Sequence, residues 1–200
     1  MLIFNLKNCL YLINNKKDKK RALEIFNDAF IDSLGIMWVL KRKTLNSKKL
    51  TIKVLFYEGF DKKGAYLTDD KNGALLFFDN NNSTTSLNNI LRKIWLVIIY
   101  SGFVNAYRLI KYRELISATR PKGVLVGFLV ATDQNVIGNG AAFEIKNQMF
   151  AIAKKLKKTI CLETSIPRVR KLYKLSGYTE YAEIKHPYED LTIWFFKKQF

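Results

Sequence analysis

The stretch VATDQNVIGNGA, residues 130–141, is the part of this chain that most directly predicts its fold. It follows a continuously apolar run, residues 123–130, typical of a strand covered on both faces. It precedes residues 142–158, where apolar side chains recur every three or four positions, as on one buried face of a helix. Gly138 and Gly140 therefore lie where a strand becomes a helix, and backbone N–H groups at such a turn can converge on an anion. The sequence thus predicts an anion-binding loop here.

Hydrophobic periodicity predicts further elements on both sides of this loop. Before it we expect a helix over 21–34, strands over 50–57 and 73–78, and helical segments over 86–100 and 103–117. After it we expect a strand over 160–164, a helix from Pro167 to Gly177 with Ser165 as its cap, and a strand over 191–196. Alternating strands and helices indicate an α/β layered domain, and the length suits a single domain over residues 1–200.

The composition favours anionic partners without naming one. The formal net charge is +17, from 34 Lys and Arg against 17 Asp and Glu, which suits nucleic acid, a membrane surface or phosphate-bearing small molecules. The basic residues are dispersed, and no zinc-finger or RRM-type motif is present, so we do not expect nucleic acid as a partner. Most of the excess charge is attributed to lysines on solvated faces.

Cysteine usage and hydropathy favour a soluble, cytoplasmic protein. Cys9 and Cys161 are far apart and belong to no Cys/His cluster, so we expect neither a metal site nor a disulfide framework. The apolar amino terminus lacks the basic region and cleavage pattern of a signal peptide. Among the other apolar stretches the longest, Ile94 to Tyr100, is far shorter than the roughly 20 residues needed to cross a bilayer, so no membrane partner is expected.

Three short motifs follow one another at informative distances. The loop reads Asn-Val-Ile-Gly-Asn-Gly over residues 135–140, the next strand reads Leu-Glu-Thr-Ser over 162–165, and the last helix ends as Tyr173-Lys-Leu-Ser-Gly177-Tyr178. This order resembles the GNAT acyl-CoA N-acyltransferase superfamily, whose core runs strand, Q/R-x-x-G-x-G/A loop, helix, strand, and a helix ending in Y-x-x-x-G-[FY]. The best-matching core is 123–200. Asn135 departs from the usual Gln or Arg, Thr132 from a proline, and Arg170 from an asparagine.

The resemblance implies a mixed central sheet with helices on both faces and a splay between two parallel strands. It also implies an N-acetyltransferase in which a primary amine attacks the thioester of acetyl-CoA directly, with no metal. The departures leave open a catalytically inactive GNAT-fold module that binds coenzyme A. A basic nucleic-acid-binding protein is the third reading. The amine acceptor would be a small molecule or a peptide, acidic ones included, and the protein a monomer or homodimer.

The resemblance also assigns residues. Tyr173 would be the general acid that protonates the leaving thiolate, or else a core tyrosine that packs the last helix on the sheet. Glu163 would be the general base, or else a strand-end carboxylate paired with Arg168. The residues that would bind the cofactor are Leu129, Val130, Ala131, Asn135, Val136, Ile137, Gly138, Asn139, Gly140, Ala141, Arg170 and Tyr173.

Two further groups of residues have no fixed role. Arg168, Arg170, Lys171 and Lys174 gather on the last helix and could meet phosphates or simply face solvent. His186, the only histidine, is interpreted as a surface or packing residue because no second histidine or nucleophile motif accompanies it. The acceptor side cannot be identified from a motif. Four aromatic residues either line it or belong to the core: Phe30, Trp38, Phe60 and Tyr66.

Overall fold

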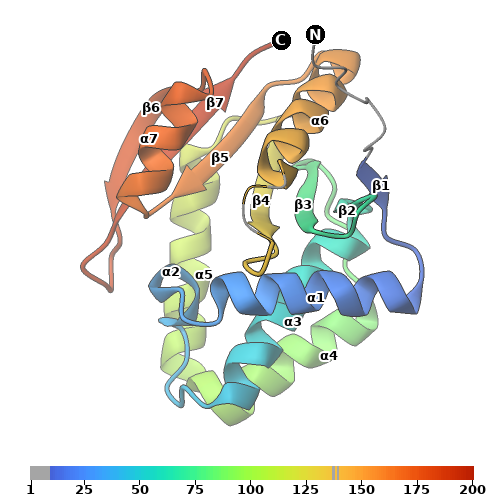
Figure 1. The fold of residues 1–200 in the computed structure, drawn as a ribbon. Helices are drawn as coiled ribbons and strands as arrows, with labels where there is room; N and C mark the ends of the chain where they lie inside the picture. The colour runs from blue at the N-terminus through green and yellow to red at the C-terminus, as the bar shows by residue number, and fades with distance from the viewer. Residues whose placement is uncertain (1–9, 137, 139) are drawn as a thin grey trace, which may run out of the picture.

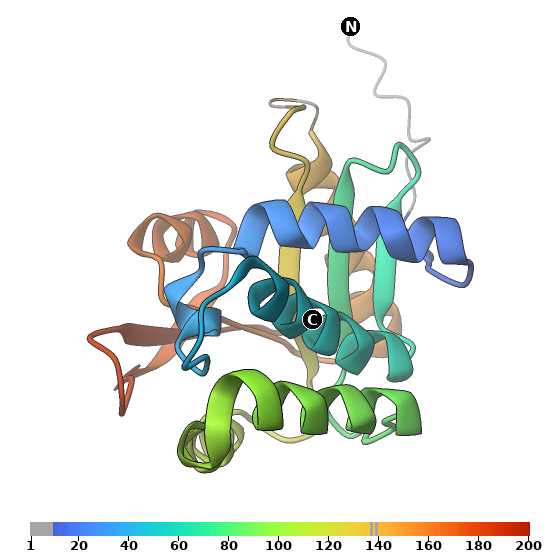
Figure 2. The same cartoon turned by 90° about the horizontal axis from the view of Figure 1, so that it is seen from below.

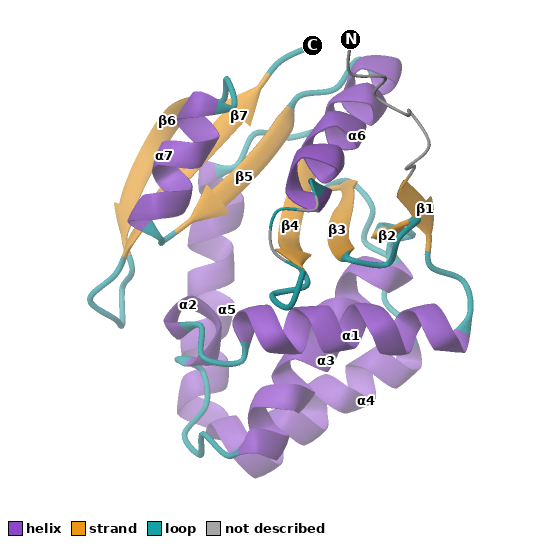
Figure 3. Ribbon diagram, viewed as in Figure 1, coloured by secondary structure: helices purple, strands orange, loops and turns teal. Residues whose placement is uncertain are grey.

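The computed structural model describes residues 10–136, 138 and 140–200, so Cys9 lies outside the described residues. Its centre is a seven-stranded sheet in the order β1-β2-β3-β4-β5-β7-β6 (Figures 1 and 3). Only β4 and β5 are parallel, and the other neighbours are antiparallel. The strands are β1 Leu10–Leu12, β2 Ala65–Thr68, β3 Gly73–Asp79, β4 Leu125–Thr132, β5 Ile160–Thr164, β6 Thr179–Lys185 and β7 Thr192–Lys198.

Helices cover both faces of the sheet, as expected for this fold class. The helices α1 and α3 pack on β3 from one face, whereas α6 packs on β2, β3 and β4 from the other, and α7 lies beside β5 and β6 (Figure 1). The helical segments are α1 Lys16–Phe30, α2 Leu34–Met37, α3 Leu45–Asp61, α4 Leu87–Leu96, the π-helical turn η1 Val97–Ser101, α5 Gly102–Thr119, α6 Ala141–Leu156 and α7 Pro167–Leu175.

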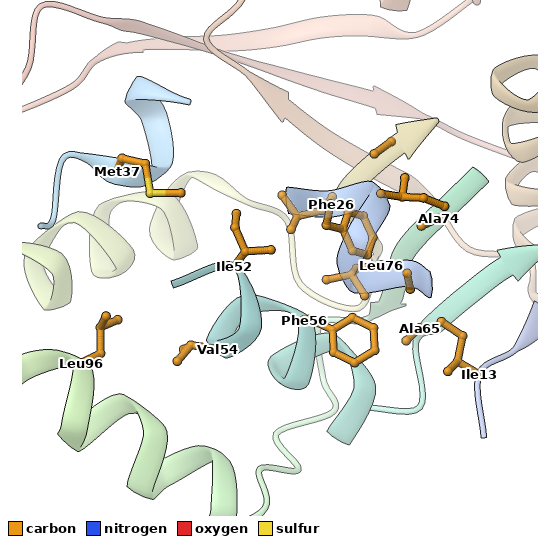
Figure 4. Packing of buried hydrophobic residues seen from close by; sticks show 14 of the residues in the cluster. Ile13, Phe26, Met37, Ile52, Val54, Phe56, Ala65, Ala74, Leu76 and Leu96 are labelled. Atoms are coloured by element: carbon orange, nitrogen blue, oxygen red, sulfur yellow. The ribbon is translucent and has the colours of Figure 1, made fainter. Parts of the chain in front are cut away.

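The core contains two large apolar clusters and a smaller third one, formed by Phe78, Val124, Val126 and Cys161. In one large cluster, Phe26 of α1 and Phe56 of α3 pack near Leu76 of β3 (Figure 4). In the other, Ile145 and Met149 of α6 pack against Phe77 and Leu162. Because successive side chains of a strand point to opposite faces, the apolar run of β3 supplies both large clusters. Both faces of β3 are therefore buried, which gives the unbroken apolar run from which this strand was predicted.

The strand predicted over 50–57 is wrong, because these residues lie inside α3. The N-cap residue of this helix is Thr44, whose side-chain oxygen accepts a hydrogen bond from the Ser47 N–H. It contacts α1, α4 and the sheet, so apolar residues are needed on several of its sides. A helix buried on several sides loses the 3.6-residue periodicity that distinguishes it from a strand.

The other boundaries agree better. The helical segments over 86–117 are confirmed as α4, η1 and α5, and the strands over 160–164 and 191–196 as β5 and β7. Pro167 begins α7, and Gly177, with φ of 79°, follows it. Ser165 does not cap α7, since the cap is Ile166 and no side chain bonds there. The elements that the sequence analysis missed are β1, β2, β6 and α2.

One helical stretch bears on the membrane expectation. Within the described residues, Leu87–Thr119 forms one helical stretch of 33 residues that is long and apolar enough, by length and composition, to cross a membrane. This stretch contains no long unbroken apolar run, because polar residues interrupt it, and it was therefore not recognised from the sequence. Only 11% of its most apolar window is buried.

Candidate functional site

A gap opens between the two parallel strands. β4 and β5 pair only from Leu125 to Gly127, opposite Ile160 to Leu162. Beyond this point β4 stays paired with β3 up to Thr132, and β5 stays paired with β7, so their ends point apart (Figure 1). Among the described residues no strand pairs with the β5-facing edge of residues 128–132. Backbone groups on this edge can therefore bind an extended ligand that carries amides.

Gly127 explains where the pairing stops. A Cβ atom there would lie 2.3 Å from Leu162 Cδ2 and 3.0 Å from Met149 Cε, so these side chains occupy the space that a larger residue would need. The register between β3 and β4 also shifts between Leu76 and Phe77, beside Gly127. A bulge of this kind bends a strand and increases its twist. Close packing on one side and the bulge on the other turn β4 away from β5.

The predicted anion-binding loop follows directly on the open part of β4. Asp133 pairs with Arg21 of α1 and accepts hydrogen bonds from the backbone N–H (2.8 Å) and the side-chain amide (3.1 Å) of Asn135. Gly138 and Gly140 have φ of 85° and 81°, and a Cβ on either would meet nothing within 4 Å. The start of the loop is therefore fixed to α1, and its glycine end faces open space.

The helix after the loop starts at a glycine. Gly140 is the N-cap residue of α6 and has no side chain. The N-terminal end of a helix carries a partial positive charge, which favours an anion at this position. Glycines with positive φ and an open side at the start of a helix fit a bound pyrophosphate.

The predicted cofactor-binding positions divide into three groups. Leu129 and Ala131 belong to the cluster under α1, and Val130 packs toward α6, so these residues offer their backbone at the gap. In the loop, Asn135 and Val136 are exposed, Gly138 and Gly140 are open, and Ala141 is buried at the start of α6. Ile137 and Asn139 lie outside the described residues.

Tyr173 projects from α7 into the cluster beneath α6. Its ring is 5.3 Å from that of Phe196 and 5.7 Å from that of Tyr178. Burial, with a further contribution from the charge of Glu163, raises the pKa of Tyr173 to about 12. The Tyr173 phenol therefore keeps its proton at neutral pH. Its ring also packs the last helix on the sheet, the alternative role that the sequence allowed.

Glu163 has a different partner from the expected one. Its two carboxylate oxygens accept hydrogen bonds from Arg120, at 2.7 Å from Nε and 2.8 Å from Nη2. Arg168 was expected there instead. Arg120 follows α5 and belongs to none of the motifs, so sequence reasoning missed it. If Glu163 took up a proton as a general base, this ion pair with Arg120 would be broken. The role of Glu163 as the base stays a prediction.

Arg170 was placed among the cofactor-binding residues, and the structure directs it elsewhere. Its guanidinium donates to Glu180 of β6 at 2.9 and 2.5 Å, comes within 3.4 Å of Glu183, and lies 4.5 Å from the centroid of the Trp194 ring. Lys174 also pairs with Glu180, at 2.9 Å. These two cations of α7 thus bind the carboxylates of β6.

Four aromatic residues gather on the α5 side of the gap. The ring of His186 lies 4.8 Å from Trp38, 4.6 Å from Tyr112 and 6.1 Å from Tyr188. Burial lowers the pKa of His186, and its Nδ1 accepts a hydrogen bond from the Tyr188 N–H, so the ring is neutral near pH 7 and carries its proton on Nε2. Burial and the charge of Glu163 raise the pKa of Tyr112 to about 12, which places the cluster near that carboxylate.

His186 is therefore a packing histidine, as the sequence indicated. Of the four aromatics named for the acceptor side, Trp38 belongs both to this cluster and to the buried core, and Phe30, Phe60 and Tyr66 are partly buried against the core. No motif could have identified Tyr112, which lies on a helix whose periodicity gave no hint of a site.

Other chemistry is limited. Burial raises the pKa of the Cys161 thiol to about 11, so this thiol stays protonated. No group of three or more His, Cys, Asp or Glu residues able to hold a metal occurs in the part of the chain that the structure describes. Two surface hollows lie away from the gap, one beside α1 and α3 and the other beside the end of α5.

Comparison with solved structures identifies the architecture. The C-terminal condensation domain of Ebony in complex with beta-alanyl-dopamine superposes with a TM-score of 0.68 at 13% identity, over 97% of this chain and 99% of that one. An acetyltransferase related to histone acetyltransferases from Corynebacterium glutamicum gives 0.63 at 16% identity, over 94% of both chains. The chain has the GNAT fold.

The likeness extends beyond the best-matching core. A mosquito arylalkylamine N-acetyltransferase-like protein also has the GNAT fold, with a TM-score of 0.57 at 12% identity over 96% of this chain and 100% of that one. The first half, which lies outside the best-matching core, therefore belongs to the same GNAT fold. No protein-family model matches the sequence, and no curated protein matches it either.

Proposed function

We propose that this protein is an N-acyltransferase that transfers an acetyl group from acetyl-CoA to a primary amine. The observation that carries the proposal is the half-paired strand β4, which leads without interruption into a glycine loop with an open side at the start of α6. An extended amide-containing arm and a pyrophosphate occur together in coenzyme A, and the two features suit them in that order. Acetyl-CoA would supply the acetyl group as an activated thioester.

The residues that would hold the cofactor are mainly backbone groups. The free edge at Leu129, Val130 and Ala131 would pair with the pantetheine amides, as an added strand pairs with a sheet edge. Backbone N–H groups between Val136 and Ala141 would donate to the pyrophosphate oxygens. Since side chains contribute little to such binding, Asn135 in place of Gln or Arg is compatible with it.

Tyr173 is proposed as the proton donor. A general acid must hold its proton at working pH, and a pKa of about 12 satisfies this condition. Glu163 and Arg120 close the other side of the gap, and the aromatic cluster around His186 adjoins them. The acceptor is proposed to be a small amine, by analogy with the arylalkylamine and agmatine N-acetyltransferases that share the fold.

The decisive experiment measures binding and turnover separately. Acetyl-CoA should raise the unfolding temperature, because a ligand at a hundred times its Kd stabilises the native state by about 2.7 kcal/mol. Release of free thiol would then be followed with a panel of aryl, alkyl and peptide amines. Tyr173→Phe should abolish most turnover, whereas Tyr178→Phe, which removes the neighbouring hydroxyl, should not.

Three results would distinguish the alternatives. Binding of acetyl-CoA without thiol release on any amine would identify an inactive coenzyme A-binding module. Steeply salt-dependent binding of DNA or RNA, with no stabilisation by acetyl-CoA, would identify a nucleic-acid-binding protein. Equal turnover of Tyr173→Phe and the unaltered protein would remove Tyr173 from the mechanism. The cytoplasmic location remains a prediction.

A further inference from the structure

The segment Leu87–Thr119, formed by α4, η1 and α5 and here called the apolar arm, turns its apolar side chains to solvent. Phe103 is 81% exposed and Leu87 72%. In α5 no residue is buried among those that the structure describes, and in α4 only Asn89 and Leu96 are. Contiguous exposed apolar surface of this kind marks an interaction site. The other large, exposed apolar residues of the arm are Ile90, Leu91, Ile94, Trp95, Ile98, Ile99, Val104, Tyr107, Ile110 and Leu115.

The arm contacts the domain through polar residues as well as through the apolar contacts of Leu96, Tyr100, Leu109 and Tyr112. Glu58 of α3, whose side chain is 12% exposed, forms ion pairs with Lys93 of α4 at 3.3 Å and with Arg113 of α5 at 2.5 Å. Arg92 stacks 4.0 Å from the centroid of the Tyr57 ring. Asn105 donates a hydrogen bond to the Val39 carbonyl at 3.1 Å. Because charged and polar groups face the protein, much of the apolar side faces outward, the reverse of a normal amphipathic helix.

The arm is bent, which decides between crossing a membrane and lying on one. Straight, a helix of 33 residues would be about 50 Å long. Instead η1 and Gly102, with φ of 75°, set α4 and α5 at an angle, and Figure 2 shows α4 lengthwise with α5 nearly end-on. Crossing would also break the ion pairs of Glu58. The geometry suits a helix pair lying in the interface of a bilayer.

Charge at the bend specifies the kind of surface. The backbone N–H groups of Lys41 and Arg42 both donate to the Tyr100 carbonyl, at 2.9 and 3.2 Å, so this basic turn lies against the bend. Lys41, Arg42 and Lys43 are all exposed. Of the five basic residues of the arm, Lys93 and Arg113 pair with Glu58 and Arg92 stacks on Tyr57, so the exposed basic turn supplies most of the charge beside the apolar face. Cations beside exposed apolar groups match anionic lipid headgroups over acyl chains.

A second copy of this chain fits the arm less well. Two such faces would bring like charges together, in a protein whose net charge is already +17. The exposed aromatics Trp95 and Tyr107 instead suit a membrane interface, where amphipathic rings accumulate. Charge and aromatic content therefore favour lipid as the occupant.

We propose that the apolar arm and the basic turn Lys41–Lys43 bind the surface of an anionic membrane. Apolar side chains near the bend enter the headgroup region, and the basic turn neutralises lipid charge beside them. The proposal replaces the sequence-based expectation of no membrane partner. It is independent of the proposed acetyltransferase activity, because the arm's exposed face contributes no residue to the β4–β5 gap.

The test is flotation of the full chain with vesicles of phosphatidylcholine alone or with about 30% phosphatidylserine. Binding is expected only with the anionic vesicles and should weaken as salt is raised. Trp95→Ser with Phe103→Ser should weaken partitioning by about tenfold or more, from lost apolar burial. Neutralising Lys41, Arg42 and Lys43 to Gln should weaken it by about a hundredfold.

Matched variants elsewhere provide the control. Leu175→Ser with Phe143→Ser removes exposed apolar groups from α7 and α6, and neutralising Lys154, Lys155 and Lys157 removes exposed charge. Both should bind vesicles like the unaltered protein. Failure to bind anionic vesicles overturns the proposal, and so does equal weakening by arm and control variants. A dimer that dissociates on Phe103→Ser, without vesicle binding, would make a second copy the occupant and also overturn it.

Discussion

The ion pair between Arg120 and Glu163 allows the role of the predicted base to be separated from its contribution to stability. The two side chains are 16% and 17% exposed. Removing one partner of a buried pair costs about 3–5 kcal/mol, whereas an exposed pair contributes at most about 1 kcal/mol. For a pair with about one-sixth of each side chain exposed, we expect about 2–3 kcal/mol for Arg120→Gln or Glu163→Gln alone.

The loss is measured by thermal unfolding. For a chain of this length each kcal/mol lowers the unfolding temperature by about 2–4 °C, so each single variant should lose about 4–12 °C. The double variant leaves no unpaired charge. Its loss should be smaller than the sum of the single losses by about 1.5 kcal/mol or more. Arg170→Gln, which breaks a more exposed pair with Glu180, serves as the matched control and should cost less.

Turnover in the same variants assigns the role. If Glu163 only positions the gap, the double variant should recover activity together with stability, and this is the outcome that the two-bond pairing leads us to expect. If Glu163 is the base, the double variant should remain as slow as Glu163→Gln. Strictly additive stability losses would refute the reasoning, because they would mean that the two side chains do not stabilise each other.

Three further predictions follow from individual residues. Tyr173→Phe should lower kcat by about a hundredfold or more while the Kd for acetyl-CoA changes little, and the pH–rate profile should show no loss from Tyr173 ionisation below about pH 11; a basic limb near neutral pH that disappears in the variant would contradict this. Gly140→Ala forces a side chain into a left-handed conformation costing about 1–2 kcal/mol, and calorimetric titration should show weaker acetyl-CoA binding; an unchanged Kd would count against the loop as the binding site. Burial alone would raise the pKa of Glu58, but its cations lower it to about 2 from 4.5. A carboxylate with a lowered pKa stabilises the folded state at pH values above its ordinary pKa, and this stabilisation is lost as the pH falls toward 2. Glu58→Gln should therefore cost about 3 kcal/mol in urea unfolding at pH 7 and much less at pH 2.5. Equal losses at both pH values would refute the assignment.

The features that sequence predicted best are those fixed by local pattern. The apolar strand β4, the glycine loop and helix α6 follow one another without long-range help, and the motifs at Glu163 and Tyr173 fixed the order of the later elements. The mixed sheet and the splay came from the resemblance, and the order of the strands was not predicted, because no local pattern states which strands pair. The helix α3 was mistaken for a strand because three neighbours bury it.

Contacts between distant residues could not be predicted in the same way. Arg120 and Glu163 are 43 positions apart, and no sequence motif connects Arg120 with the strand that contains Glu163. The resemblance placed Arg170 among the cofactor-binding residues. In the structure Arg170 instead pairs with Glu180 and Glu183 of β6, a strand that was not predicted. The apolar arm was overlooked because its polar residues interrupt every continuous run.

The half-paired strand β4 also has a consequence for amide hydrogen exchange. Along residues 128–132, successive N–H groups point alternately to β3 and to the gap. Those bonded to β3 should exchange with solvent slowly, and those facing the gap should exchange quickly. A ligand that adds a strand-like partner would slow the second set and leave the first unchanged. Alternating fast and slow exchange along residues 128–132 would therefore indicate an empty gap, and uniformly slow exchange an occupied one. The measurement does not require the acceptor to be known.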